Sequence, residues 1–152
     1  MDKRAEFSAA LKVALKNKDK VALATIRLIM ASLKDRDIAA REKGEASGLD
    51  ENTILSMLQS MIKQRHESSK TYSEAGRDDL AEREEAEIDV IRSFMPKQLD
   101  EDEIREIIDS IIATTGASSV KDMGKIMGVL KEKYAGQIDM GKAGGFVKAK
   151  FA

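Results

Sequence analysis

The sequence predicts an all-α protein. Apolar residues recur at three- and four-residue spacings, no stretch alternates apolar and polar residues like a strand, and a single proline interrupts the 152 residues. The predicted architecture is an N-terminal helical hairpin bundle in residues 1–97, which holds four helices, followed by a small three-helix tail domain in residues 98–152.

The first two predicted helices are separated by the short polar break at residues 17–19. The first helix spans residues 3–16, and its apolar face is predicted to carry Phe7, Ala10, Leu11, Ala14 and Leu15. The second helix extends to about Arg41 and carries Val21, Leu23, Ile26, Met30 and Leu33. Because its apolar face is wide, we expect this helix at the centre of the bundle.

The third and fourth helices are expected to form an antiparallel hairpin. Asp50 is the predicted N-cap of the third helix, and Gly76 the left-handed residue that ends it. Asp79 with Glu82 resembles a capping box for the fourth helix, which Pro96 stops. The loop between these helices is too short for any other arrangement.

Folding this hairpin about Gly76 predicts an ion pair between Arg65 and the carboxylates of Glu84 and Glu87. These side chains continue the apolar stripes of their helices, so they should face one another. The expected role of the pair is structural, because it would fix the register of the two helices.

The tail is predicted to contain three short helices. A capping box formed by Asp100 and Glu103 begins one that ends at Gly116, and Ser119 with Asp122 begins a second that ends at Gly136. Their apolar stripes are expected to be Ile104, Ile107, Ile108 and Ile111 in the former and Val120, Met123, Met127, Leu130 and Tyr134 in the latter. The last helix covers about residues 139–151.

The composition excludes most catalytic chemistry. With no cysteine and one histidine, the chain offers no thiol nucleophile, no Cys-based zinc site and no histidine relay. We therefore expect no catalytic residues, no metal and no cofactor. No apolar run approaches the roughly 20 residues of a membrane span, and the first residues lack a signal-peptide core, so a cytoplasmic protein without a membrane partner is expected.

The net charge of −1 conceals an uneven distribution. Residues 98–119 hold 1 basic and 6 acidic residues, net −5, whereas residues 120–152 hold 7 basic and 3 acidic residues, net +4. In this basic segment Gly124 and Gly128 lie one helical turn apart, although each costs about 1 kcal/mol in a helix interior. Two explanations remain open, close packing of another helix or close approach of a phosphate backbone beside the lysines.

Several segments resemble the GatB/YqeY family. They are the Arg-containing segment at residues 25–29, Gln-Arg-His-Glu-Ser at 64–68, Gly-Arg-Asp-Asp-Leu at 76–80, and Lys-Asp-Met-Gly-Lys-Ile-Met-Gly at 121–128. The resemblance covers essentially the whole chain and implies an all-helical protein of two parts. The tail is similar to the last domain of the B subunit of the glutamine-dependent tRNA amidotransferase, where it helps to hold tRNA.

The resemblance implies that this chain contacts tRNA through its tail. Carried over to matching positions, the contacts are Lys121, Gly124, Lys125, Gly128, Gly136, Lys142 and Lys148, and the charge pattern adds Lys131. The leading hypothesis is a non-catalytic tRNA-binding adaptor in translation, whose protein partners would be amidotransferase subunits or an aminoacyl-tRNA synthetase.

Two alternatives stay open. The chain is an accessory component of a glutamine-dependent carbon–nitrogen ligase, with any such activity arising by association, or it is a protein–protein interaction module that uses the acidic region 78–109 to bind a basic partner.

Overall fold

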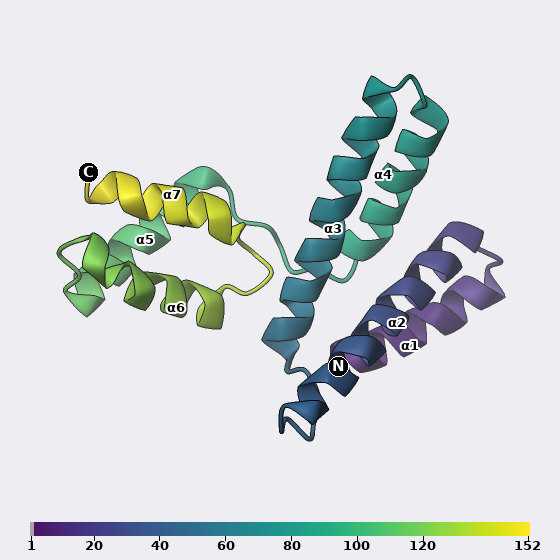
Figure 1. Cartoon of the computed structure of the whole chain (residues 1–152), viewed down its shortest axis with the longest axis horizontal. Helices are drawn as coiled ribbons and strands as arrows, with labels where there is room; N and C mark the ends of the chain where they lie inside the picture. The colour runs from purple at the N-terminus through teal and green to yellow at the C-terminus, as the bar shows by residue number, and fades with distance from the viewer. Residues whose placement is uncertain (1) are drawn as a thin grey trace. The chain divides into compact units, whose positions relative to one another are not determined.

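A computed structural model describes residues 2–152 and confirms the all-α fold. The chain forms two compact units, Met1–Met95 and Pro96–Ala152 (Figure 1). In the described residues the first unit holds helices α1–α4, and the second holds α5–α7 with one 3₁₀ turn, η1.

The first unit consists of two helical hairpins. Helices α1 (Lys3–Lys16) and α2 (Lys20–Glu42) pack against each other, and so do α3 (Glu51–Glu74) and α4 (Asp78–Arg92). Figure 1 shows both pairs as antiparallel neighbours. Aspartates at positions 2, 19 and 50 cap the first three helices by accepting hydrogen bonds from backbone N–H groups three residues on.

The core of the first unit draws residues from all four helices. Phe7 of α1 packs edge-on against Phe94, just beyond α4, with ring centroids 4.9 Å apart. Fully buried aliphatic and Met side chains surround them, namely Ile29, Ile54, Met57, Leu58 and Ile91.

Two expectations about apolar faces are wrong. Leu15 is 51% exposed and Val21 is 43% exposed. The wide apolar face of α2 does not lie entirely in the core. Only its inner side, which includes Ile26, Ile29 and Leu33, is buried there. Its outer side remains on the surface of this unit.

The start of α4 also differs from the prediction. The N-cap is Arg77, which makes no side-chain capping bond, and Asp79 lies inside the first turn. The guanidinium of Arg77 instead pairs with Asp79, with Nε and Oδ1 3.3 Å apart. Gly76 has φ +73° and provides the expected left-handed turn. The helix ends at Arg92, before Pro96.

The second unit contains α5 (Glu101–Thr115), η1 (Val120–Asp122), α6 (Met123–Lys133) and α7 (Met140–Lys150). Asp100 caps α5 through the Glu103 N–H group, and Gly116, with φ +69°, ends it as predicted. Ser119 caps a 3₁₀ turn rather than the α-helix expected there, and Val120 is exposed rather than on the core stripe.

The core of the second unit is formed by three helices and the turn before α7. Its fully buried members include Ile108, Ile126, Leu130, Ile138 and Val147. Ile126 is the α6 residue that the sequence reasoning missed. Backbone and side-chain bonds from residues 98 and 99 reach the 136–137 turn, with Leu99 N donating to the Gln137 carbonyl at 3.0 Å.

Candidate functional site

A face of α6 and of the turn before it carries most of the predicted tRNA-binding residues. Lys121, Gly124, Lys125, Gly128 and Lys131 follow one another at spacings of three, one, three and three residues, so they occupy one side of the helical turns. All five are exposed. The buried residues of α6, Ile126 and Leu130, lie on its other side.

The two glycines of this face do not pack against another helix. A Cβ atom built on Gly124 or Gly128 would meet no heavy atom within 4 Å. The glycine that allows close helix packing is Gly144 of α7, where a Cβ would lie 3.3 Å from Cε of Met123. Of the two explanations left open for Gly124 and Gly128, close helix packing is therefore wrong within this unit.

A carboxylate lies at the start of the lysine face. Asp122 accepts a hydrogen bond from the Ser118 N–H group at 2.9 Å. That bond is the main reason why the pKa of Asp122 is lowered, and the charge of Lys125 lowers the pKa further. Asp122 therefore holds the turn that begins α6 and stays ionised beside Lys125.

The remaining predicted contacts lie outside α6, in the turn before α7 and on α7 itself. Gly136 is buried with φ +77°, and its carbonyl accepts from the Gln98 side chain at 2.6 Å, so its position serves the turn. Lys142 and Lys148 are both exposed on α7. They lie six residues apart, which places them on different sides of that helix.

The predicted hairpin pair has one direct contact. Arg65 Nε donates to Glu87 Oε2 at 3.1 Å, and both side chains are mostly buried. Glu84 lies near both groups without a hydrogen bond between it and Arg65 in the described contacts. Burial, and then the charge of Glu87, raise the pKa of Glu84. The ion pair thus joins α3 to α4 through Glu87.

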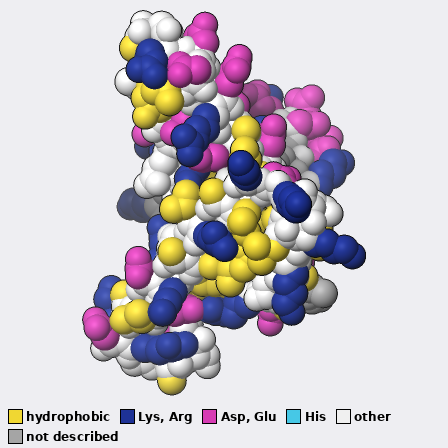
Figure 2. Space-filling view, turned by 90° about the vertical axis from the view of Figure 1, so that its right-hand side faces the viewer, with side chains coloured by type: hydrophobic (Ala, Val, Ile, Leu, Met, Phe, Trp, Pro, Cys, Tyr) yellow, Lys and Arg dark blue, Asp and Glu magenta, His cyan; other side chains and the backbone are white. Residues whose placement is uncertain are grey.

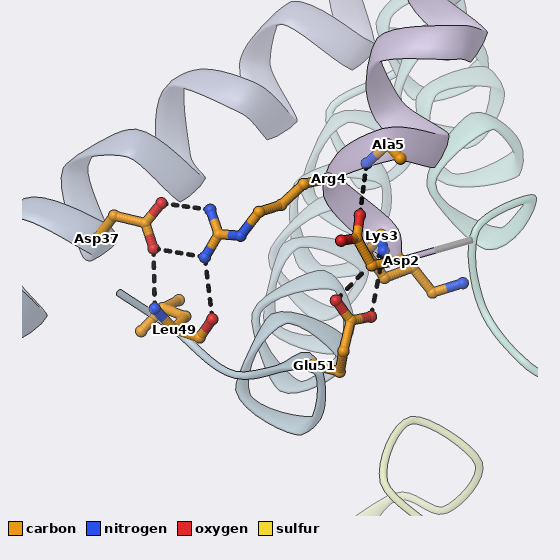
Figure 3. Close-up of polar contacts among 7 residues, drawn as sticks. All are labelled: Asp2, Lys3, Arg4, Ala5, Asp37, Leu49 and Glu51. Carbon is orange, nitrogen blue, oxygen red and sulfur yellow. Dashed lines mark hydrogen bonds and ion pairs between the residues drawn. The ribbon is translucent and has the colours of Figure 1, made fainter. Parts of the chain in front are cut away.

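A second charged cluster was missed by the sequence reasoning (Figure 3). Asp37 of α2 is 6% exposed and accepts two hydrogen bonds from the guanidinium of Arg4, one of them from Nη2 at 2.9 Å. It also accepts from the Leu49 N–H group, while Arg4 Nη2 donates to the Leu49 carbonyl, both at 2.9 Å. Mainly through the Arg4 hydrogen bonds, the pKa of Asp37 falls to about 2.

Gly48 leaves the space that this cluster needs. Its φ is +78°, and a Cβ atom there would lie 2.4 Å from Asp37 Oδ1. The sequence signal that could have found the cluster is Asp37 itself, since it lies four residues after Leu33 on the core side of α2. A carboxylate there requires a partner, because an unpaired buried charge is costly.

The acidic region 78–109 is divided between the two units, since α4 belongs to the first and α5 to the second. Asp78, Glu82, Glu85 and Asp89 form one row on α4 and line a shallow groove with Ser73 of α3. Among residues 2–152, no three potential metal ligands gather, and no helix has the length and apolar character to cross a membrane.

The fold and this geometry define an all-helical protein of two units, with a lysine- and glycine-bearing face on the second. The chain belongs to the YqeY-like protein family, whose model matches residues 4–151. The resemblance seen in the sequence is thereby confirmed.

Three curated relatives are yeast proteins. The chain is similar to "Altered inheritance of mitochondria protein 41, mitochondrial" of Saccharomyces cerevisiae, with 29% identity over 129 residues that cover 81% of this chain and 67% of the relative. The protein of that name from Candida glabrata is 35% identical over 85 residues, covering 56% and 45%. That from Lachancea thermotolerans is 33% identical over 95 residues, covering 62% and 49%.

Proposed function

We propose that this protein is a non-catalytic adaptor that binds tRNA through the lysine–glycine face, defined as Lys121, Gly124, Lys125, Gly128 and Lys131. The observation that carries the proposal is the open space over the two glycines. A phosphate backbone can approach the α6 backbone there, while lysines on either side neutralise its charge.

The character of the face favours backbone recognition over base recognition. No aromatic side chain occurs between residues 121 and 131. Stacking platforms are the usual means of reading unpaired bases, so binding by this face would depend on charge and on the shape of the folded RNA. Affinity should therefore fall steeply as salt concentration rises.

The test measures tRNA affinity of the whole chain by filter binding or fluorescence anisotropy at several salt concentrations. Lys125→Glu should weaken binding by about tenfold and reduce the slope against log salt by about one. Lys133→Glu is the matched control, because Lys133 is exposed on the opposite side of α6 and should have a smaller effect. No binding at low salt, or equal losses in both variants, would overturn the proposal.

In the amidotransferase-related alternative, the lysine–glycine face binds tRNA within a complex with other proteins. In that case the chain would bind tRNA weakly alone and contribute in the presence of amidotransferase subunits or an aminoacyl-tRNA synthetase. Addition of the purified chain to a transamidation assay would change the rate, and Lys125→Glu would abolish that change. An unchanged rate would contradict this alternative.

The acidic row on α4 favours the second alternative, a basic protein partner. Glu82→Lys together with Glu85→Lys would remove such binding and leave the melting temperature nearly unchanged, because both residues are exposed and outside the Arg65–Glu87 pair. Loss of tRNA binding in this variant would contradict a separate role for the row.

A further inference from the structure

The outer side of α2 presents an apolar stripe to solvent. Val21, Leu28 and Ile38 are 43%, 49% and 46% exposed, and Ala24 and Ala31 between them are exposed as well. Isolated exposed apolar residues are ordinary, whereas several of them in one row along a helix are typical of a surface that another molecule covers.

The spacing of this stripe is that of a coiled-coil seam. Val21, Leu28 and Asp35 are seven residues apart, and so are Ala24, Ala31 and Ile38, which gives alternating steps of three and four residues. The core residues of α2, such as Ile26, Ile29 and Leu33, lie on its opposite side. The stripe is therefore a second seam, independent of the core.

A row of positive charge follows one edge of this seam. Lys20, Arg27, Lys34 and Arg41 recur every seven residues, each directly before a seam position of the Val21 series, and all four are exposed. Figure 2 shows one face of the molecule, on which hydrophobic side chains lie among Lys and Arg side chains. In a coiled coil these flanking positions select the partner by charge.

The other edge of the seam carries no charge. Its corresponding positions are Thr25, Ser32 and Ala39, of which Thr25 is buried. A second copy of α2 is consequently a poor occupant. In an antiparallel pair the basic row would lie against itself, and in a parallel pair it would lie against these uncharged residues.

We propose that the outer side of α2 docks an amphipathic helix of a partner protein, with an apolar seam that packs on the stripe and an acidic row that faces Lys20, Arg27, Lys34 and Arg41. Alanines at positions 24 and 31 allow the partner backbone to approach closely. A groove beside the stripe, lined by Met30, Ile38 and Ser8 among others, accepts larger apolar side chains.

Asp35 selects the register in which the partner helix docks. It occupies a seam position yet is charged and exposed. A single polar residue in a seam reduces stability but selects one alignment, because burial against an apolar residue would leave it without a partner. The partner helix should present a basic or polar side chain opposite Asp35.

The experiment measures binding of the whole chain to a fluorescent, synthetic four-heptad helix with Leu in the seam and Glu at both flanking positions. Mutual repulsion of the Glu residues keeps this probe monomeric. We expect it to bind at least tenfold more tightly than the same helix with Lys in place of Glu. Arg27→Glu with Lys34→Glu should reverse this preference, and Leu28→Gln should weaken binding of either helix.

Arg36→Glu is the matched control, since Arg36 is exposed on the same helix outside the basic row. It should leave the preference unchanged, and circular dichroism verifies that each variant is folded. Equal binding of the two probes, or an equal effect of Arg36→Glu, would overturn the proposal. So would dimerisation of the chain that Leu28→Gln abolishes, or displacement of the probe by phosphatidylserine vesicles.

This inference does not depend on the proposed tRNA site. Lys125→Glu should leave binding of the Glu helix intact, and Arg27→Glu with Lys34→Glu should leave tRNA binding intact. If tRNA displaces the Glu helix from α2, the basic row belongs to an RNA surface, and the docking proposal fails while tRNA binding stands.

Discussion

The two units of this protein use charge in different ways. In the first unit, Asp37 and Glu87 lie largely out of solvent and pair with arginines that join neighbouring segments. In the second unit the core consists of aliphatic residues, with three methionines and three aromatic rings packed at its edge, and the predicted tRNA-contacting lysines remain exposed. Buried charge therefore joins segments of the first unit, whereas an ion pair of the second unit, between Lys150 and Asp109, lies at its surface.

The glycines of the second unit teach a related lesson. Gly144 is buried against Met123, whereas Gly128 faces open space. Both lie in helices, where glycine is unfavourable. Since packing explains Gly144 and not Gly128, the cost at Gly128 is compensated by function if the proposed tRNA site is correct.

The largest effect is expected from Ile126→Ala. Ile126 is fully buried in α6, and truncation of such a residue costs about 3 kcal/mol through lost burial and the cavity left behind. If the units are as separate as their cores suggest, native-state hydrogen exchange should detect the loss in residues 96–152 only. Equal deprotection of α3 and α4 would contradict that separation.

Asp37→Asn should destabilise the first unit by about 2 kcal/mol. The substitution removes the negative charge of Asp37 and leaves the partly exposed guanidinium of Arg4 without its ion-pair partner. The pKa of Asp37 is lowered from 3.8 to about 2. Stabilisation by ionised Asp37 is therefore complete above pH 3.8 and is lost as pH falls toward 2. The difference between wild-type and Asp37→Asn unfolding free energies should shrink over that interval, and a difference independent of pH would contradict the assignment.

A smaller effect separates the two carboxylates near Arg65. Glu87→Gln should cost about 1 kcal/mol, since it removes an ion pair with Arg65 that is mostly buried. Glu84→Gln should be neutral or slightly stabilising at pH 7, because the raised pKa of Glu84 indicates that its charge is unfavourable there. Urea denaturation measures the free energy of unfolding of both variants. An equal decrease in the two would contradict the assignment of the ion pair to Glu87.

The smallest effect has the opposite sign. Gly128→Ala should stabilise the second unit by about 0.5–1 kcal/mol, because alanine favours the helix and its Cβ meets no neighbour. If the proposed tRNA site is correct, the same variant should weaken tRNA binding. Thermal denaturation and tRNA affinity, measured on the same samples, reveal whether stability and binding change in opposite directions.

The sequence predicts what local chemistry determines. The caps at Asp50 and Asp100 and the left-handed turns at Gly76 and Gly116 occur as expected, because each depends on a few adjacent residues. The exposure of Val21 could not be predicted, since periodicity identifies an apolar face without identifying what covers it. The Arg4–Asp37–Leu49 cluster joins residues 33 and 45 positions apart, a juxtaposition that depends on tertiary packing.

That cluster has a consequence for limited proteolysis. The exposed loop at residues 43–47 connects α2 to α3, and Arg4 lies before it while Leu49 lies after it. Lys3 N also donates to the carboxylate of Glu51, and these two residues likewise lie on opposite sides of the loop in the sequence. A protease that cuts this loop would therefore produce two fragments that remain bound to each other and elute together until the salt bridge is protonated or the helices are denatured.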